Sequence, residues 1–548
     1  MKLYYLRFFL TAVALSLCTL CLNAQTNDYS WDKLPEIKQP AFRPDTFNIV
    51  RFGAISNGNT LNTKSINEAI IACNRKGGGV VLIPAGYWLS GPVELKSNVN
   101  LHLEKNALLQ FTADFNQYKI IEGNYEGKPS ARNQSPIMGT NLENIAITGF
   151  GTIDGNGDAW RMVGKNALTE AEWNKKKLSG GLVSEDGKTW FPSEKTKKAY
   201  LEKSSVLLGP AKKLSDFEDI KDFLRPNLVV LTNCSKVLLE GLTFQNSPAW
   251  NLHPLMCNNL TIRNIKVKNP DYAQNGDGVD IESCKNVLVE GSVFDVGDDA
   301  ICIKSGKDEE GRKRNMPTEN VIIRNNLVYA GHGGFVVGSE MSGGARNIFV
   351  SDCSFMGTDK GIRFKTTRGR GGIVEKIYIK NLNMFNIVDE AIFFDMYYWT
   401  KPPEANEIQQ VPKVSIETPQ FKDIFIENIV CNGANKGVFI RGLPEMAVKN
   451  IKMKNLFLNT NNAIEIIDAD HIEIKNSVLL TKRKDPLVYI ESSKNINLDG
   501  VRFNPEAGVL FDINGVSTSN IRMKNADLKN DAIKASFNHG AQEKSFKK

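Results

Sequence analysis

The sequence predicts an all-β fold, a right-handed parallel β-helix with a small N-terminal α/β cap and a long side insertion. The first observation is a set of segments between Asn275 and Lys365 in which apolar residues alternate with others, the period of a strand with one buried face. When one small residue of each segment is aligned, the apolar residues one and three positions later coincide. The aligned residues are Gly278, Ala300, Gly334 and Gly361, continued by Ala391, Gly437, Ala463, Leu487 and Gly508.

A second strand pattern recurs between these segments, and it is the second observation. Repeats of roughly 20–50 residues indicate a solenoid in which each unit buries its apolar face on its neighbours. The third observation is that helical periodicity is sparse and the turns are polar, which makes a parallel β-helix the simplest arrangement. The Asn that opens most repeats suits a turn, because its side chain can bond local backbone. The repeats open at Asn259, Asn286, Asn320, Asn347, Lys376, Asp423, Asn450, His471, Asn495 and Asn520.

Residues 1–24 are predicted to be a secretory signal peptide cleaved near Ala24. Lys2 and Arg7 precede an apolar run that is too short to favour a membrane span. We therefore expect a secreted or periplasmic protein without a membrane span. A lipoprotein with Cys18 or Cys21 lipidated is an alternative. The lack of an acidic or Ser-rich tether after either cysteine argues against it.

The mature chain is predicted to hold one domain. Residues 25–45 are expected to form an extended lead-in, 46–540 a single β-helix domain, and 541–548 a frayed tail. A helix over Ser65–Cys73 is expected to cap the open end of the solenoid. Residues 157–225 break the repeat, are rich in Lys, Glu and Trp, and are interpreted as an insertion that forms one wall of a cleft.

Charge and cysteine content exclude several kinds of protein. The formal net charge is +7, or +5 without Lys2 and Arg7, which is compatible with an acidic polymer as partner. No basic cluster with interleaved aromatic residues favours nucleic acid. Seven cysteines lie outside the signal, an odd number without CxxC spacing. They indicate neither a metal site nor a full disulfide framework, and we expect a monomer without a metal or other cofactor.

The polar residues of the aligned segments are the candidate site. Asp277 and Asp299 should stack at strand spacing, so that the pKa of at least one of them rises. Asp298 points to a slightly different place. One protonated and one ionised carboxyl are what inverting glycoside hydrolysis requires. His332, in register with Asp298, can tune or replenish the proton.

Two cations suggest an acidic sugar polymer. Arg363 could bind a carboxylate bidentately, with Lys365 adding a point charge. Taken singly these residues have plainer interpretations: Gly-Asp-Asp and Gly-His-Gly are common turns, and Glu282 over Lys304 suits a supporting ion pair. Trp250 and Trp399 suit either sugar stacking or packing. The case for a site rests on their common register.

The chain resembles glycoside hydrolase family 28, the polygalacturonase family, in a bacterial pectin-degrading form. Four motifs occur in the family's order, over a likeness that spans about residues 45–525: Asn275-Gly276-Asp277, Asp298-Asp299, Gly331-His332-Gly333 and Arg363-Phe364-Lys365. The resemblance implies a right-handed parallel β-helix and an enzyme that inverts the anomeric centre without a metal. It implies that Asp298 is the general acid, that Asp277 with Asp299 activates water, and that His332 supports the acid.

The resemblance also implies a pectic polysaccharide or oligogalacturonide as substrate. Arg363 and Lys365 would bind the galacturonate at the cleavage point, with Asn275 and Lys304 as further contacts. Tyr397 is the first candidate for a tyrosine near the sugar, and Tyr398 competes with it. The long insertion favours exo action or branched pectins such as rhamnogalacturonan. The alternatives are a calcium-dependent pectate lyase, in which the Asp cluster holds Ca²⁺, and a non-catalytic glycan-binding β-helix.

Overall fold

The computed structural model describes residues 29–402, 410–482, 486–504, 510–526 and 533–548. Two units follow one another along the chain, residues 1–35 and 36–548. In the first, a short turn is closed by reciprocal backbone hydrogen bonds of 3.1 Å between Ser30 and Lys33. The predicted signal peptide, residues 1–24, lies outside the described residues. Within the described ranges, no helix is both long and apolar enough to cross a membrane.

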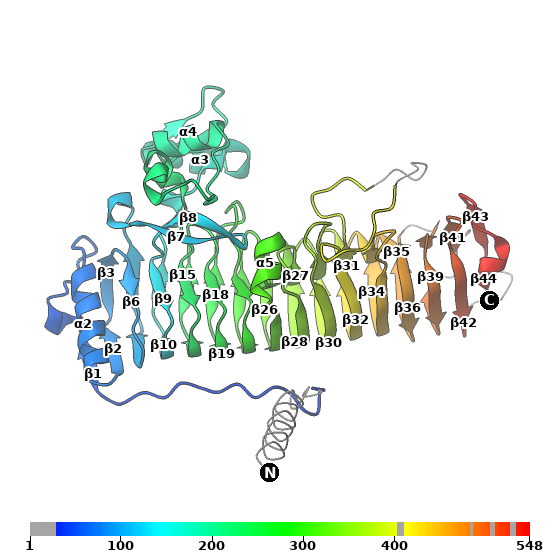
Figure 1. The fold of residues 1–548 in the computed structure, drawn as a ribbon, viewed down its shortest axis with the longest axis horizontal. Coiled ribbons are helices and arrows are strands. Elements are labelled where there is room, and N and C mark those ends of the chain that lie inside the picture. Colours follow the sequence, from blue (N-terminus) through cyan, green and yellow to red (C-terminus); the bar gives the residue numbers. More distant parts are fainter. Residues whose placement is uncertain (1–28, 403–409, 483–485, 505–509, 527–532) are drawn as a thin grey trace, which may run out of the picture. The chain divides into compact units, whose positions relative to one another are not determined.

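Residues 36–548 form a right-handed parallel β-helix, as the sequence predicts. Strands of successive coils stack side by side along the axis (Figure 1). Sheet A contains one strand from each coil. Its strands are β4 (Val93–Glu94), β9 (Ile137–Thr140), β15 (Val229–Thr232), β18 (Leu252–Leu255), β21 (Val279–Glu282), β24 (Asp299–Lys304), β27 (Gly333–Gly338), β29 (Ile362–Lys365), β31 (Glu390–Asp395), β33 (Lys436–Arg441), β35 (Asn462–Ile467), β38 (Val488–Glu491), β41 (Phe511–Asn514) and β43 (Ala535–Asn538).

Sheet B contains the second repeated strand and its continuation around each coil. The repeated strands are β1 (Thr46–Asn48), β2 (Gly79–Ile83), β5 (Val99–Leu103), β10 (Glu143–Gly149), β16 (Ser235–Glu240), β19 (Asn258–Arg263), β22 (Lys285–Glu290), β25 (Thr318–Arg324), β28 (Ala345–Met356), β30 (Ile373–Phe385), β32 (Gln420–Asn432), β34 (Val448–Thr460), β36 (Ala469–Lys475), β39 (Lys494–Asp499), β42 (Ser519–Lys524) and β44 (Phe546–Lys547). The separate continuations are β3 (Gly86–Ser90), β6 (Ala107–Phe111), β11 (Thr152–Asp154), β17 (Thr243–Gln245), β20 (Lys266–Lys268), β23 (Val293–Asp295), β26 (Leu327–Ala330), β37 (Val478–Thr481) and β40 (Arg502–Phe503).

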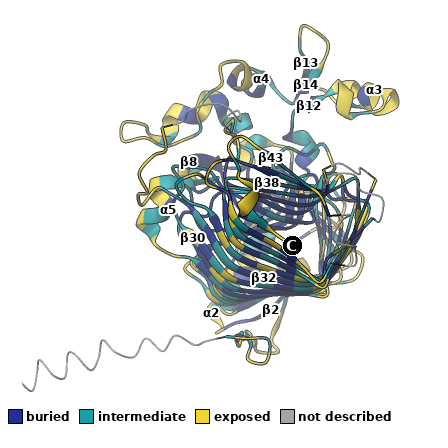
Figure 2. Ribbon diagram, turned by 90° about the vertical axis from the view of Figure 1, so that its right-hand side faces the viewer, coloured by how far each residue is buried: buried dark blue, intermediate teal, exposed yellow. Residues whose placement is uncertain are grey.

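The register of sheet A is the one that the aligned segments predict. Val279 lies opposite Ile301, which lies opposite Phe335 in the next coil. The apolar residues of each strand point inward and form one continuous buried core (Figure 2). The prediction fails at the last repeat: Val488 pairs with Phe511, two residues beyond the expected Val509. Because strands have a period of two, a shift of two residues keeps the same face inward; Gly508 itself lies outside the described residues.

An asparagine ladder closes the corner at which several of the repeated strands of sheet B begin. Asn286, Asn320 and Asn347 have φ of 57°, 60° and 55°, the left-handed region that Asn tolerates better than most residues. The amide of Asn320 donates to Asn286 Oδ1 at 3.0 Å, and that of Asn347 donates to Asn320 Oδ1 at 3.1 Å. The side chains therefore link neighbouring coils at the point where each one turns.

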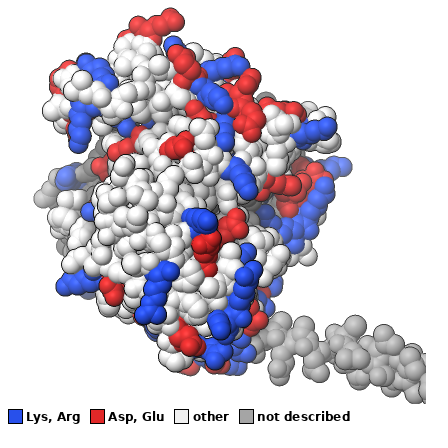
Figure 3. Space-filling view, turned by 90° about the vertical axis from the view of Figure 1, so that its left-hand side faces the viewer, with Lys and Arg blue, Asp and Glu red and all other residues white. Residues whose placement is uncertain are grey.

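The N-terminal end of the coil is covered by α2 (Thr63–Arg75), which confirms the predicted cap. Its buried face, Ile66, Ala69, Ile70 and Cys73, packs on the first strands of both sheets. Acidic and basic side chains are interspersed over this end of the molecule (Figure 3). At the other end, β44 pairs with β42, so the expectation of a frayed tail was wrong for residues 546–547.

Residues 157–225 leave the coil and build small hydrophobic cores. They include a helix near Thr169, as the sequence suggests. Val163, Trp173 and Trp190 form one buried cluster, and Ala199, Phe217 and Leu224 belong to another. The elements are β12 (Val163–Gly164), α3 (Glu170–Leu178), β13 (Leu182–Val183), β14 (Thr189–Phe191), α4 (Glu194–Leu201) and a 3-10 segment, Leu214–Phe223.

The sequence did not predict an antiparallel hairpin that precedes the insertion, β7 (Ile120–Tyr125) and β8 (Lys128–Asn133). A short helix, α5 (Asp308–Arg314), follows β24. The seven cysteines Cys73, Cys234, Cys257, Cys284, Cys302, Cys353 and Cys431 are buried and free, as expected of small core residues.

The asparagine ladder predicts a stability difference between two substitutions at one position. Asn320→Ala removes two side-chain hydrogen bonds and puts a Cβ without a polar group at φ 60°, so we expect a loss of about 2–4 kcal/mol in the free energy of unfolding. Asn320→Gly removes the same hydrogen bonds without the backbone penalty and should cost about 1–2 kcal/mol less than the alanine. Urea denaturation of both variants measures this. Equal losses of unfolding free energy in the two variants would show that the left-handed backbone conformation does not contribute to the destabilisation by alanine.

Candidate active site

The register of sheet A brings the polar residues of four coils to one outer surface. Asp277 precedes β21, Asp299 begins β24 directly after Asp298, and His332 precedes β27. Arg363 and Lys365 lie on β29, one coil further. Each side chain is held by a strand whose inward neighbours are fixed in the core, so the cluster is set by the coil itself.

Three carboxyl groups meet at the centre of this surface. Asp277, Asp298 and Asp299 each place one oxygen within 4.8 Å of the others. Asp277 is 3% exposed and Asp299 1%, whereas the side chain of Asp298 is 23% exposed. The backbone N–H of Asp299 donates to Asp298 Oδ1 at 2.9 Å. Two of the carboxyls therefore form the floor of the site, and the third faces its opening.

The charge of Asp299 is balanced by the two cations of β29. Lys365 Nζ lies 2.6 Å from Asp299 Oδ2, and an Arg363 guanidinium nitrogen lies 3.2 Å from Oδ1. Burial would raise the pKa of Asp299, but Lys365 and Arg363 hold it well below the ordinary value. Asp299 is therefore ionised at neutral pH. The Arg363 Nε–H is buried and has no hydrogen-bond partner among the described residues, so a donor is left over for another group.

Asp277 has the opposite character. Burial raises its pKa well above the ordinary value, and the nearby carboxyl groups of Asp280 and Asp298 raise it further. Its Oδ1 has no hydrogen-bond partner within the described part of the chain. The expectation that one pKa of the stacked pair rises is thus confirmed, and Asp277 is the residue concerned.

His332 lies over the exposed carboxyl. Its Nδ1 is 3.2 Å from Asp298 Oδ1, and its Nε2 is 3.7 Å from Asp359 Oδ2. The hydrogen bond to Asp298 raises the pKa of His332 above its ordinary value of 6.5. Asp359 was missed by the sequence analysis because it lies in a turn, where no strand alternation marks it.

The two candidate tyrosines are separated by the structure, which favours Tyr398. Its ring centre lies 5.0 Å from Lys365 Nζ and 5.7 Å from the Arg363 guanidinium carbon. Tyr397, the first choice from the sequence, is buried and accepts a 3.4 Å hydrogen bond from Arg368. Consecutive residues at a strand end point in different directions, and the sequence alone did not show which one faces the cations.

Lys304 does not form the expected ion pair with Glu282, although the two are opposite in register. Its Nζ lies 2.9 Å from a Glu340 carboxylate oxygen and 3.4 Å from one of Asp280. The same Nζ lies 4.7 Å from the ring centroid of Trp250. The side chain is buried, so the structure places it beneath the site as support and not as a free substrate ligand.

Asn275 is held by the insertion. Arg225 donates to Asn275 Oδ1 at 3.1 Å and to the backbone oxygens of Gln274 and Pro248 at 2.7 and 2.9 Å. The residue that ends the insertion therefore fixes the loop that leads into Asp277. Asn275 positions that loop, and its carbonyl oxygen is already occupied.

The two candidate tryptophans differ in exposure. Trp250 is 4% exposed and packs against His253 and Lys304. Trp399 is 88% exposed, and its ring meets that of Tyr398 at 5.2 Å. Packing is confirmed for Trp250, and Trp399 remains open beside the cationic pair.

The trio of carboxyls has the ligand type and closeness that a divalent cation needs. Two features oppose such a role. Both oxygens of Asp299 are engaged by Lys365 and Arg363, and these cations would repel a metal ion at the same place. The charge at the centre is thus already balanced by side chains of the protein.

Comparisons with known proteins match this arrangement. The sequence model of glycosyl hydrolases family 28 fits residues 218–458, and that of rhamnogalacturonase A/epimerase, pectate lyase-like, fits residues 46–206. A probable polygalacturonase from Vitis vinifera is 31% identical over 427 residues, 76% of this chain and 75% of that protein. An exo-poly-alpha-D-galacturonosidase from Dickeya chrysanthemi is 27% identical over 478 residues, 84% and 75% of the two chains.

Solved structures agree. An exopolygalacturonase from Thermotoga maritima superposes with a TM-score of 0.63 at 30% identity, covering 80% of this chain and 90% of that one. The family 28 exopolygalacturonase from Yersinia enterocolitica gives a TM-score of 0.65 at 26% identity, covering 84% and 79%. With the four motifs gathered on one surface of a parallel β-helix, these matches show that the chain belongs to family 28 of the glycosyl hydrolases.

Proposed function

We propose that this glycoside hydrolase cleaves α-galacturonide linkages of a pectic polysaccharide or oligogalacturonide. The observation that carries the proposal is the carboxyl trio beside two cations on one surface, in a chain whose relatives are named polygalacturonases. Arg363 and Lys365 fit a substrate that bears carboxylates. Arg363 offers its unpartnered Nε–H and Lys365 a buried ammonium, the donors that recognise a uronate.

The roles of the carboxyls follow from their environments. Asp298, the most exposed, donates a proton to the glycosidic oxygen as the bond to the anomeric carbon breaks. Asp299, ionised, takes a proton from the attacking water, whose oxygen forms the new bond to that carbon. Asp277 holds the water through its unpartnered Oδ1. His332 restores the proton of Asp298.

The trio is more compact than the carboxyl pair of most inverting enzymes, whose members stand about 6.5–9.5 Å apart. Inversion is nevertheless the outcome we propose. Asp299 is bound by Lys365 and Arg363 and is poorly placed to attack carbon itself. With Asp277 beside it, the pair forms a site for one water molecule on the face opposite the acid.

Exo action is proposed from the closed end of the surface. Asp298 is paired with His332 on the C-terminal side, so the leaving sugar lies toward Arg363 and the non-reducing part toward β18. The hairpin β7–β8 crosses that side and is tied to the start of α5 by ion pairs. Lys307 Nζ lies 2.8 Å from Glu126, and Lys128 Nζ lies 2.7 Å from Asp308. A chain end fits beneath such a bridge, whereas a continuing polymer does not.

Export and assembly are also proposals. The apolar run after Lys2 and Arg7 supports secretion to the periplasm or the medium, where pectic polymers are met. We propose that the exported enzyme acts as a monomer, because the carboxyl trio and both cations come from one chain.

Hydrolysis of oligogalacturonides by the purified enzyme tests the function. Asp298→Asn should lower kcat by about 10²–10⁴-fold, because the leaving oxygen loses its proton donor. Asp295→Asn, the same change on the same coil but in β23 of sheet B, should retain activity. Proton NMR of the first product should show the β-anomer, and a chelator should leave the rate unchanged. An α-anomer would contradict inversion, and unsaturated, ultraviolet-absorbing products lost with the chelator would establish the lyase.

The proton shared by His332 and Asp298 predicts the alkaline limb of the pH profile. Because the pKa of His332 is raised above 6.5, the pair keeps its proton to higher pH than a free histidine would. We therefore expect kcat/KM to fall only as the pH rises past the raised pKa of His332. In His332→Gln the limb should move to lower pH. His471→Gln removes another histidine with a carboxylate 2.7 Å away and serves as the control. An unmoved limb in His332→Gln would remove His332 from the proton path.

Loosening the hairpin predicts a change of product pattern. The wild type should release one short product at all times. Lys128→Gln combined with Lys307→Gln breaks both ion pairs and should add a ladder of longer oligomers, read by chromatography. Lys313→Gln, in α5 but paired with Glu309 of the same helix, is the control. A ladder from the wild type would refute the closed end.

A further inference from the structure

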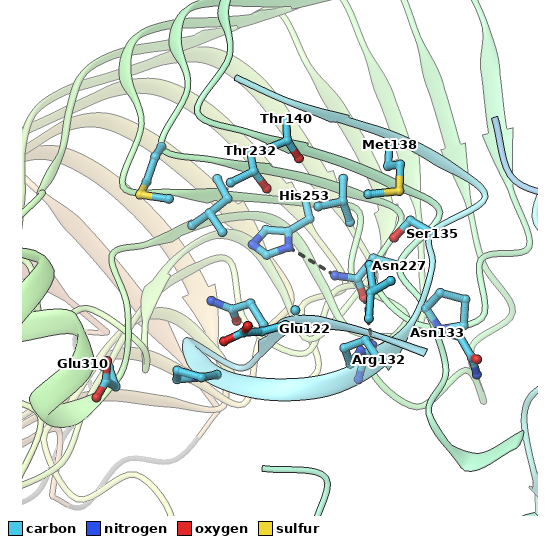
Figure 4. A pocket seen from close by; sticks show the side chains of 18 of the residues that line it. Glu122, Arg132, Asn133, Ser135, Met138, Thr140, Asn227, Thr232, His253 and Glu310 are labelled. Atoms are coloured by element: carbon cyan, nitrogen blue, oxygen red, sulfur yellow. Dashed lines mark hydrogen bonds between the residues drawn. The ribbon is translucent and has the colours of Figure 1, made fainter. Parts of the chain in front are cut away.

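A cavity of about 690 Å³ lies between the hairpin β7–β8 and sheet A. Its floor is the outer face of β9, β15 and β18, the coils that precede Asp277, and its roof is the hairpin (Figure 4). Residues of the floor are Met138, Thr140, Val230, Thr232, His253 and Leu255. The floor thus offers aliphatic surface and hydroxyl groups, which suits the two kinds of surface of a sugar ring.

Arg132 reaches this cavity from β8 without an ion-pair partner among the described residues. Its side chain donates to Asn227 Oδ1 at 3.3 Å and lies 5.2 Å from the ring centre of Tyr125. Among the described residues, no carboxylate lies within 4 Å of its guanidinium, and Glu126 is taken by Lys307. The residue is only 9% exposed, and burial together with Arg225 lowers its pKa to about 10.

Asn227 holds Arg132 in place through a chain of polar contacts. Its amide nitrogen lies 3.2 Å from His253 Nδ1, and His253 Nε2 lies 2.8 Å from Glu282. Glu282 is fixed in turn by Arg314 at 2.6 Å. Figure 4 shows Asn227 between His253 and Arg132 at the wall of the cavity. The guanidinium is thereby oriented, with Asn227 as the hydrogen-bond acceptor found for it among the described residues.

A buried cation without a carboxylate partner costs free energy that a bound anion recovers. A carboxylate fits best, because a guanidinium binds it through two parallel hydrogen bonds. The cavity also lies on the right side of the reaction centre. His253 is one strand across and three residues along from Asp277, roughly 11 Å at strand spacing. The sugar on the non-reducing side of the cleaved bond extends toward it.

We propose that the cavity receives the non-reducing end of the substrate and that Arg132 binds the carboxylate of a sugar acid there. The inference rests on the proposed function and assigns the specificity of the closed end to one side chain. Arg363 and Lys365 select acidic units on the leaving side, and Arg132 selects them on the other. The enzyme would then require a free, unesterified uronate at the chain end.

The test is equilibrium binding in the inactive Asp298→Asn background, with digalacturonate and its dimethyl ester as probes in calorimetry. Adding Arg132→Gln should weaken binding of the acid by about 10–100-fold and change that of the ester less than about threefold. Arg132→Lys keeps the charge and should be intermediate. Arg346→Gln makes the same change at a half-exposed arginine of sheet B and is the control for net charge.

The outcomes separate the inference from the function. Equal loss for acid and ester, or loss in Arg346→Gln as large as in Arg132→Gln, would overturn the inference even if the wild type hydrolyses galacturonides. If Arg132→Gln does not fold by thermal melting, the same comparison is made with Arg132→Lys, and unchanged acid binding there overturns it. An inactive wild type whose acid binding still depends on Arg132 would refute the proposed function and leave the site.

Discussion

The register between coils is the constraint on which the rest of the structure depends. The strands of sheet A carry core residues on their inner face, and β21, β24, β27 and β29 present the candidate site residues on the outer side, so a slip of one residue would bury the carboxyls and expose the core. Left-handed corner residues, most of them asparagines, start successive coils at the same phase. A backbone conformation on one side of the helix thus determines which side chains meet on another.

Balanced charge explains how three carboxyls coexist at one place. Lys365 and Arg363 hold the pKa of Asp299 low, while burial and the neighbouring carboxyls raise the pKa of Asp277. The same two cations are the ones that suit a substrate carboxylate. Under the proposed function, a uronate that shares them would weaken their hold on Asp299 and raise the pKa of its carboxyl. Binding and base strength would in this way be coupled through Arg363 and Lys365.

The repeat made most of the coil predictable, because strand alternation and corner asparagines are local signals that recur. The trio, His332 and the two cations could be assembled from the sequence for the same reason: each lies at a fixed offset within its segment. What lay outside the repeat was missed or misplaced. The hairpin β7–β8 and Asp359 do not belong to the repeated pattern. Tyr397 was preferred to Tyr398 because the sequence does not show which of the two side chains faces the cations. Lys304 was placed on the correct face but given the wrong partner, since its ammonium contacts Glu340 of the next coil and Asp280 of the same strand as Glu282.

Arg225 gives the insertion a part in completing the candidate site. The coils can stack along the axis without residues 157–225, since each contacts only its neighbours. The loop before Asp277 is completed only when Arg225 reaches the oxygens of Gln274 and Asn275. A chain whose coils are stacked but whose insertion is not docked would therefore have its carboxyls in register and the loop before Asp277 unfixed.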